Sequence, residues 1–285
     1  MNYIYPNKQI LEKRSSELGN AERYYSLSKM IFERDFKEKL LFPLGIDNEK
    51  EKYYINLIDK SGLFISGETG SGKSIFLNDI VISLLLKNSP EELQLVFVDP
   101  RNVEFNNYCE IPQVKNKVFS DAESCVKELM SLLNIIEERK ILFSNVGSKN
   151  IIDYNETQEN KIPHIVVIID ESADLVEYKA SKDYIRRILL DGYKFGIHII
   201  LATSSYLKNS FDPETINMFS YVLSFDLASE EQAKYIQIKK ANLLSVYGEA
   251  LVKLDDDSIV NIQVPYVSDH DIEEVVNTIK NTNKS

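Results

Sequence analysis

The stretch LFISGETGSGKSIFLNDIV, residues 63–81, decides the fold class because it places a glycine-rich loop between two apolar runs. The loop fits the pattern G-x-x-x-x-G-K-[ST] at Gly67, Gly72, Lys73 and Ser74. Glycines let successive backbone N–H groups turn toward phosphate oxygens, and the helix that follows adds the positive end of its dipole. A strand before the loop and a helix after it are the context that this motif requires. The stretch therefore predicts a nucleotide-binding P-loop.

The residues of this loop are expected to hold ATP and Mg²⁺ together. Lys73 should reach the β- and γ-phosphates, and the Ser74 hydroxyl should ligate the metal ion. The predicted contacts with the nucleotide extend along the whole loop and into the first turn of the helix. They comprise Gly67, Glu68, Thr69, Gly70, Ser71, Gly72, Lys73, Ser74 and Ile75.

An acidic pair follows another apolar run, HIVVIIDESADL at residues 164–175. A P-loop ATPase needs a carboxylate at the end of a strand beside the loop, and Asp170 and Glu171 stand where this strand should end. Asp170 is predicted to hold Mg²⁺, directly or through water, and Glu171 to act as general base on the attacking water. The alternatives are a helix-capping Asp170 and a solvated Glu171. The P-loop favours the catalytic interpretation, with Lys73 as the third catalytic residue.

A third apolar strand ends at Asp99 in VFVDPRNVEF, residues 96–105. In a parallel sheet its carboxylate would lie at the same edge as the P-loop, with Arg101 close by. The Asp-Pro pair is equally typical of a surface turn. The residues alone leave both interpretations open.

Alternating strand and helix patterns across residues 62–281 predict the class of the fold. Near-continuous apolar strands separated by helices indicate a mainly parallel sheet that is covered on both faces. Two strands across the turn at residues 255–257 predict an antiparallel edge hairpin, and two further short strands are expected around the turn at 47–51. The sequence therefore predicts an α/β, three-layer P-loop NTPase fold.

The composition fits a single globular domain inside the cell. The 285 residues are 44% hydrophobic, and no stretch approaches the roughly 18 uninterrupted apolar residues of a membrane span. The N-terminus lacks the layout of a secretory signal, so the chain is expected to be cytoplasmic. The two cysteines and three histidines show no zinc-ligand spacing. The net charge of −11 counts against a protein whose whole surface binds duplex DNA, and leaves room for a local basic strip or a pore.

The motifs occur in an order that resembles the motor domain of the FtsK/SpoIIIE family of DNA translocases, within the HerA/FtsK-like P-loop ATPases. That family reads approximately GTTGSGKS, VVLVDEFADL and LATQRP, and this chain reads GETGSGKS, VVIIDESADL and LATSSY. The segments DPRNVEFNNYCEIPQV and YVSDHDIEEVV also fall in register. The resemblance runs from residue 42 to 279, so residues 1–41 are expected to be an N-terminal helical extension and 280–285 a polar tail.

The resemblance implies a RecA-like core and ATP hydrolysis in a ring, a homo-hexamer or a mixed ring, with double-stranded DNA threaded through the pore. It also implies that Thr203 and Asp99 lie at the γ-phosphate edge. Related motors serve conjugation and type VII secretion, so the threaded polymer can instead be protein. The apolar stripe at residues 24–32 would pack on its own domain, which we favour, or dock on a neighbour.

The chain departs from the family pattern around the γ-phosphate and at a position that acts on a neighbouring subunit. Ser204, Ser205 and Tyr206 replace the Gln, Arg and Pro of LATQRP, and serine cannot reach as far toward a γ-phosphate. Tyr193 stands at the expected arginine-finger position and is followed by Lys194. An arginine finger contributes roughly 10³–10⁵ in rate, which tyrosine cannot supply.

A second basic position of the family is taken by Glu230, with Lys234 nearby. Three explanations of these departures stay open. Lys194 or Arg187 supplies the charge, the ring hydrolyses ATP slowly, or the chain binds ATP and barely turns it over.

Two functions follow from the motifs. The first is a cytoplasmic motor ATPase that uses ATP and Mg²⁺ to translocate or transfer double-stranded DNA. The second is an ATP-binding coupling or assembly protein with weak hydrolysis that acts on protein clients, which the acidic charge and the missing finger favour. The intact Asp170–Glu171 pair opposes the second function, because an inactive site has little use for a base.

Overall fold

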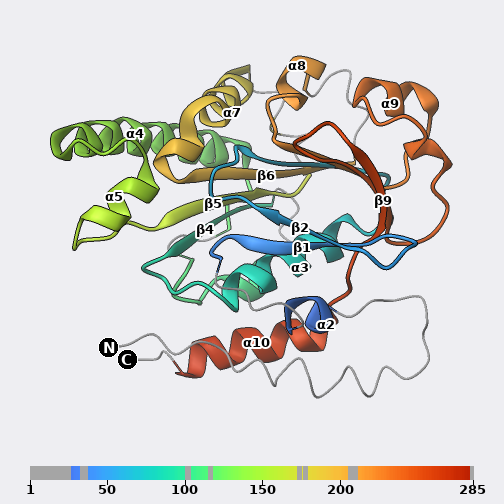
Figure 1. Ribbon diagram of the computed structural model, residues 1–285, viewed down its shortest axis with the longest axis horizontal. Helices are drawn as coiled ribbons and strands as arrows, with labels where there is room; N and C mark the ends of the chain where they lie inside the picture. Colours follow the sequence, from blue (N-terminus) through green and yellow to red (C-terminus); the bar gives the residue numbers. More distant parts are fainter. Residues whose placement is uncertain are drawn as a thin grey trace.

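A nine-stranded sheet in the order β2-β1-β9-β8-β7-β3-β6-β5-β4 lies at the centre of the protein in the computed structural model (Figure 1). The structure describes residues 27–32, 38–99, 104–114, 118–171, 175, 179–204 and 211–282. The strands are β1 (Leu41–Ile46), β2 (Lys52–Asn56), β3 (Gly62–Ser66), β4 (Leu93–Val98), β5 (His164–Ile169), β6 (Ile197–Thr203), β7 (Tyr221–Ser224), β8 (Glu249–Lys253) and β9 (Ile259–Gln263).

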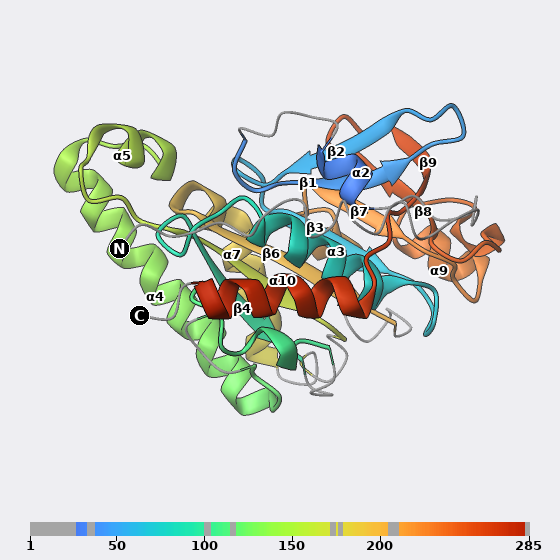
Figure 2. The same ribbon diagram turned by 90° about the horizontal axis from the view of Figure 1, so that it is seen from below.

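Helices cover both faces of the sheet and complete three layers (Figures 1 and 2). One face carries α2 (Leu27–Phe32), α3 (Lys73–Leu85) and α10 (Asp269–Thr282), and the other carries α4 (Ala122–Val146), α7 (Lys179–Asp191) and α9 (Glu230–Tyr235). The shorter elements are α5 (Ile151–Thr157), α8 (Pro213–Ile216) and the 3₁₀ turns η1 (Asn106–Tyr108), η2 (Gly192–Phe195) and η4 (Ala241–Leu243). The α/β, three-layer arrangement predicted from the sequence is confirmed. Within the described ranges, no helix combines the length and hydrophobicity that crossing a bilayer requires.

The strands β7, β3, β6, β5 and β4 form a parallel half-sheet. Their sequences are near-continuous apolar runs, and every residue of β3, β5 and β6 is buried. A sheet covered on both faces requires such runs, because each strand sends alternate side chains into opposite layers. The carboxyl ends of these strands therefore meet at one edge of the sheet.

The strands β8, β9, β1 and β2 extend the sheet in antiparallel fashion. The predicted hairpin across residues 255–257 is present as β8–β9, and the predicted pair around residues 47–51 is present as β1–β2. The pairing of Ile46 with Gln263 joins β1 to β9 and makes the two hairpins part of one sheet. The β8–β9 hairpin therefore lies inside the sheet and not, as the sequence predicted, at its edge, because the β1–β2 hairpin pairs with β9 and takes the edge position.

Two helices are shorter than the sequence predicts. The helix expected to continue through residue 195 ends at Asp191 and passes into η2. The helix expected to reach residue 240 ends at Tyr235. Gln237 and Lys240 adopt φ angles of +61° and +73°, which an α-helix excludes. Hydrophobic periodicity does not reveal such left-handed residues, so it overestimates both helices.

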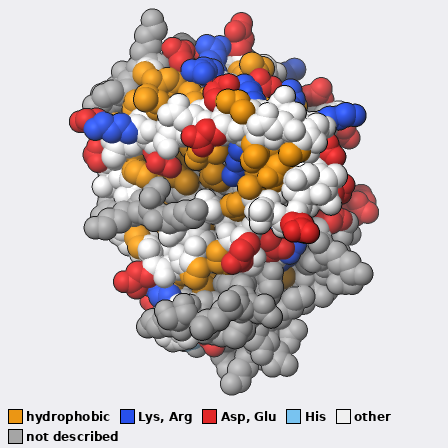
Figure 3. Space-filling view, turned by 90° about the vertical axis from the view of Figure 1, so that its left-hand side faces the viewer, with side chains coloured by type: hydrophobic (Ala, Val, Ile, Leu, Met, Phe, Trp, Pro, Cys, Tyr) orange, Lys and Arg blue, Asp and Glu red, His pale blue; other side chains and the backbone are white. Residues whose placement is uncertain are grey.

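The helix α4 runs along one side of the molecule. Its N-cap is Asp121, whose side chain accepts a hydrogen bond from the Ser124 N–H at 2.8 Å. Its C-terminal turns lie beside α5 at the end of the molecule seen in Figure 3, where hydrophobic side chains are interspersed with acidic and basic ones. Ile141 and Val146, on these turns, are 65% and 44% exposed.

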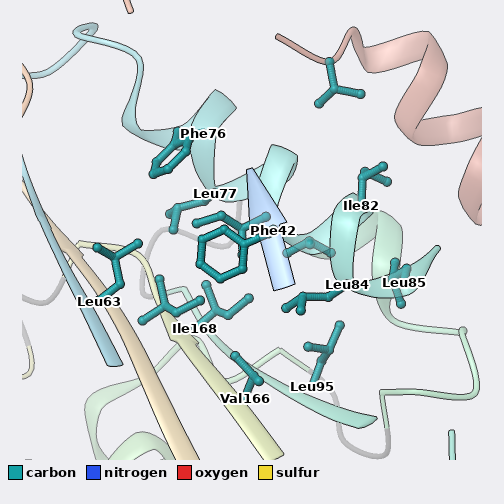
Figure 4. Packing of buried hydrophobic residues seen from close by; sticks show 14 of the residues in the cluster. Phe42, Leu63, Phe76, Leu77, Ile82, Leu84, Leu85, Leu95, Val166 and Ile168 are labelled. Atoms are coloured by element: carbon teal, nitrogen blue, oxygen red, sulfur yellow. The ribbon is translucent and has the colours of Figure 1, made fainter. Parts of the chain in front are cut away.

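The core on the α3 face centres on Phe42 of β1. This ring is fully buried, with Leu77 and Leu84 of α3 on one side and Ile168 of the sheet on the other (Figure 4). Almost the whole circumference of α3 is buried. A helix packed in this way is fixed relative to the sheet, and it fixes Lys73 at its first turn.

The described part of the N-terminal extension packs on the domain itself. Leu27, Met30 and Ile31 are buried, and the Leu27 N–H donates to the Tyr266 oxygen at 3.2 Å. In this structure the apolar stripe thus covers its own domain, as we favoured from the sequence. Most of the predicted extension lies outside the described residues.

The substitution Phe42→Ala is expected to lower the free energy of unfolding by about 3–5 kcal/mol, because it opens a cavity between α3 and the sheet. Urea denaturation of the nucleotide-free protein measures this loss. Ile141→Ala, which removes an exposed side chain, is the control and should change stability by less than about 1 kcal/mol. Equal losses in the two variants would contradict the described packing.

Candidate nucleotide-binding site

The P-loop joins the carboxyl end of β3 to the amino end of α3. Gly72 is the N-cap of α3 with a φ of +117°. A Cβ at Gly67 would lie 2.7 Å from the Phe225 Cβ, so this position has no space for a side chain. Both positions therefore require glycine. The loop presents the first N–H groups of α3, which have no partners within the helix, toward the space where a phosphate would bind.

The Lys73 side chain closes the loop on itself. Its Nζ donates to the backbone oxygens of Gly67 at 2.7 Å and of Glu68 at 2.8 Å, and the residue is only 7% exposed. The ammonium group thus lies inside the turn of backbone that would surround a phosphate. Phosphate binding at this position replaces two carbonyl oxygens with phosphate oxygens as the acceptors.

The other predicted loop residues lie along the same turn. Thr69 and Gly70 are exposed at its tip, and Ser74 and Ile75 are half-buried in the first turn of α3. The Ser71 Oγ is buried and has no hydrogen-bond partner among the described residues. A buried hydroxyl without a partner is costly, and a phosphate oxygen can supply that partner. The donors of the loop therefore fit a polyphosphate.

Residues after β7 support the loop, although no motif in the sequence indicated them. The Glu68 N–H donates to the Asp226 oxygen at 2.8 Å, and the Glu68 carboxylate accepts from the Ala228 N–H at 3.2 Å. Phe225 is fully buried and packs against Phe76 of α3 with 6.1 Å between ring centroids. The Glu68–Ala228 contact joins positions 160 residues apart, so no local pattern could reveal it.

The parallel strands place the other predicted residues at the edge that carries the loop. Ser66 ends β3 and pairs with Thr203, which ends β6 and is 1% exposed. Asp99 and Asp170 directly follow β4 and β5, whose last residues are paired with each other. Because these strands are parallel neighbours, their carboxyl ends form one continuous edge. The structure thus brings the three strand-end residues to the side of the sheet where the P-loop lies.

Asp170 lies in a cluster of acids. Burial raises its pKa to about 6, and neighbouring carboxylates add to the shift. In order of effect these neighbours are Glu104, Asp99 and Glu171, and the Lys73 ammonium acts in the opposite direction. Oxygen ligands with excess negative charge are those that Mg²⁺ prefers, so the cluster fits Asp170 as a magnesium ligand. The sequence did not indicate the contribution of Glu104.

Asp99 is almost fully buried and contacts the backbone of Glu104. Its Oδ2 accepts a hydrogen bond from the Glu104 N–H at 2.8 Å, and the residue is 1% exposed. The side chain therefore helps to hold Glu104 and also adds negative charge near Asp170. Arg101 lies outside the described residues.

Glu171 turns its side chain toward the end of β6. The residue is 5% exposed and has a φ of +53°. Its Oε2 accepts hydrogen bonds from the Ser204 N–H at 3.1 Å and from the Ser204 hydroxyl. The carboxylate is thus held within the site instead of being solvated. The sequence identified Ser204 only as a shorter residue than the glutamine of the family, and gave no indication of this partner.

Tyr193 and Lys194, considered above for a role in a neighbouring site, precede β6 in the chain. Thr203 ends the same strand, so these two residues lie at the opposite edge of the sheet from their own P-loop. The Lys194 Nζ pairs with the Asp191 carboxylate at 2.9 Å. Neither residue therefore belongs to the site of its own chain.

The other residues considered for supplying a positive charge to a neighbouring site are also on the surface. Lys234 pairs with Glu230 at 2.7 Å along α9, and Arg187 is exposed on α7. The ion pairs of Lys194 and Lys234 are exposed, so each contributes little to stability and can exchange partners.

Comparison with known proteins decides the family of this chain. Residues 27–210 match the FtsK/SpoIIIE family. The chain belongs to this family. The matched region contains the P-loop, the acidic pair and the end of β6, in agreement with the resemblance of the motifs.

Curated relatives include proteins named DNA translocase FtsK and DNA translocase SpoIIIE. FtsK from Campylobacter jejuni is 33% identical over 294 aligned residues, which cover 96% of this chain and 30% of the relative. SpoIIIE from Bacillus subtilis is 30% identical over 284 residues, which cover 92% of this chain and 36% of the relative. This FtsK/SpoIIIE chain therefore spans about a third of the length of these relatives.

Solved structures confirm the fold of this FtsK/SpoIIIE chain. The cytoplasmic domain of the type VII secretion ATPase EccC from Thermomonospora curvata superposes with a TM-score of 0.75 at 19% identity, over 90% of this chain and 34% of that one. The pCW3 conjugation coupling protein TcpA, in a monomer form with ATPγS, gives 0.74 at 24% identity, over 93% and 75%. At these identities the likeness establishes a P-loop ATPase fold.

The substitution Asp170→Asn is expected to stabilise the nucleotide-free protein by about 1–3 kcal/mol at about pH 8, because it removes a carboxylate whose ionisation the site opposes. An acid with a raised pKa stabilises the folded state at low pH and loses that contribution as the pH rises through about 6. The difference between the variant and the wild type should therefore shrink toward about pH 4. Denaturation at several pH values measures it, and a constant difference would contradict the charge cluster.

Proposed function

We propose that this FtsK/SpoIIIE family member is a cytoplasmic motor ATPase that hydrolyses ATP to translocate or transfer double-stranded DNA through a ring. The observation that carries the proposal is the convergence of Lys73, Asp170 and Glu171 at one edge of a parallel sheet. Curated relatives named as DNA translocases support the choice of DNA. In this proposal the ring is a homo-hexamer or a mixed ring, and Tyr193 and Lys194, at the opposite edge of the sheet, would face the site of a neighbouring subunit.

The loop and the first acid bind the nucleotide in this proposal. Lys73 exchanges its bonds to the Gly67 and Glu68 oxygens for bonds to the β- and γ-phosphates. The Ser74 hydroxyl and the Asp170 carboxylate hold Mg²⁺. The metal ion, when bound, supplies positive charge that offsets the charge of the transferred phosphoryl group.

Glu171 is the base in the proposed hydrolysis. The oxygen of a water molecule bonds to the γ-phosphorus while the bond from the γ-phosphorus to the β,γ-bridging oxygen breaks, and its electron pair stays on ADP. The proton of the water passes to the Glu171 carboxylate. In this proposal Thr203, at the end of the strand between the base and the loop, contacts the γ-phosphate.

The acidic chain needs a local surface to hold DNA. With a net charge of −11, the chain as a whole repels a phosphate backbone. The face seen in Figure 3 interleaves acidic and basic side chains, so we expect the DNA surface elsewhere, on loops that line a pore. A ring would compensate for the weak attraction of each subunit to DNA, because several subunits contact one duplex together.

A second candidate is an ATP-binding coupling or assembly protein with weak hydrolysis that acts on protein partners. The Tyr193 side chain at the expected finger position favours it, since a tyrosine cannot place a guanidinium in a neighbouring site. The Glu171 carboxylate, held at the same edge of the sheet as the P-loop, opposes this second candidate. The two candidates differ in whether DNA accelerates hydrolysis.

The substitution Glu171→Gln is expected to lower kcat by about 10²–10⁴ while nucleotide affinity stays within about threefold, because amide nitrogen and oxygen cannot accept the proton of the water. Retention of labelled ATP after gel filtration, compared with the wild type, measures the trapped state. Unchanged turnover would show that another residue is the base.

The proposed function is tested by steady-state ATP hydrolysis with and without long linear duplex DNA, at low and at moderate salt. We expect DNA to stimulate hydrolysis several-fold and salt to weaken the effect, since counterions compete for the phosphates. Lys73→Ala, which removes the ammonium from the loop, should abolish nucleotide binding and serves as the blank. A flat response with ATP binding intact would reject the DNA motor and favour the second candidate. ATP affinity retained in Lys73→Ala would reject the assignment of the loop.

A further inference from the structure

The proposed base, Glu171, is held by its neighbour Ser204. The Ser204 N–H lies 3.1 Å from the Glu171 Oε2 and 3.4 Å from Oε1, and the Ser204 hydroxyl donates to Oε2. The φ of Glu171, +53°, is in the left-handed region, which residues other than glycine enter at an energetic cost. The hydrogen bonds to Ser204 therefore help to hold the carboxylate on a strained backbone.

Ser204 stands between the base and the P-loop. It directly follows β6, which pairs with β5 on one side and with β3 on the other. Glu171 follows β5 by two residues, and the P-loop follows β3 directly. A residue at the end of the central strand can thus contact the base on one side or a bound γ-phosphate on the other.

Side-chain length decides between these two contacts. The family pattern has a glutamine at the position of Ser204, which is long enough to extend toward a γ-phosphate. Serine ends at its Oγ, and here that hydroxyl already donates to Glu171. At this position the chain therefore carries a side chain that contacts the proposed base.

We propose that Ser204 is a positioning residue for Glu171, holding its carboxylate through the N–H and the hydroxyl in the orientation that accepts the proton of the attacking water. This inference rests on the proposed role of Glu171 as general base. Ser204 contacts neither the water nor the phosphates in this arrangement. Its loss should consequently reduce kcat and leave nucleotide affinity unchanged.

The test compares Ser204→Ala with Ser204→Thr in steady-state ATP hydrolysis by the full chain. Ser204→Ala removes the hydroxyl and keeps the N–H, so kcat should fall about tenfold, the effect of one hydrogen bond to a charged group. The KM for ATP and the Kd for ATPγS should stay within about twofold. Ser204→Thr keeps a hydroxyl and should retain kcat within about threefold. Ser258→Ala, which removes an exposed hydroxyl in the β8–β9 turn, is the matched control.

A Glu171→Ala background separates positioning from a general structural effect. Without the carboxylate, Ser204→Ala should leave the residual rate unchanged within about twofold, because the two residues act through one contact. Three results would overturn the inference. They are additive losses in the double variant, an unchanged kcat in Ser204→Ala, and a tenfold rise in Kd with kcat unchanged.

Two results separate this inference from the proposed function. If Glu171→Ala hydrolyses ATP as fast as the wild type, Glu171 is not the base and the proposed function fails at that point. If the wild type turns over ATP too slowly to measure, thermal unfolding of the wild type, the two single variants and the double variant decides the contact. If the losses in free energy of unfolding of the two single variants do not add up to the loss in the double variant, the Ser204–Glu171 contact is supported. If they do add up, the contact and the inference built on it are overturned.

Discussion

The parallel pairing of β3 with β6, and of β6 with β5, is the constraint on which the site depends. It places Ser66, Thr203 and Asp170 at one edge of the sheet, although they come from distant parts of the chain. Strands that are apolar along their whole length, with both faces buried, hold this register firmly, because a slip by one residue would exchange the side chains of two layers. The loop, the acids and the base face one another as a consequence of core packing. No direct contact among them is needed to bring them together.

Charge is the second organising feature of the site. Asp170 interacts electrostatically with three other carboxylates and with the buried Lys73, and its pKa is raised mainly by burial and further by those carboxylates. The fold therefore opposes the ionisation of Asp170. In the proposed site a metal ion would offset these acids and the lysine would offset the phosphates, so that each charge of a metal–nucleotide pair would have a partner. Stability and ligand binding would then be opposed at this position, as is common in functional sites.

The sequence predicted the parts of the site that are local in the chain. The P-loop lies between a strand and a helix with their own patterns, and Asp170 ends an apolar run, so each could be recognised without its neighbours. Contacts between strand ends are different. Ser204 lies beside Glu171 because β5 and β6 are neighbours in this register, and Asp226 supports Glu68 through a backbone bond that most residue types could make. Pattern and propensity carry no information about such pairs, and the same limit applies to the joining of the two hairpins through β9.

The bonds of Lys73 to the carbonyl oxygens of its own loop have a kinetic and thermodynamic consequence. The loop acts as an intramolecular competitor that occupies the lysine before any ligand arrives. In the proposed site the apparent affinity for a nucleotide would equal the intrinsic affinity of the open loop multiplied by the fraction of molecules in which the loop is open. Part of the free energy of phosphate binding would thus be offset by the loss of the two bonds that Lys73 makes within its own loop.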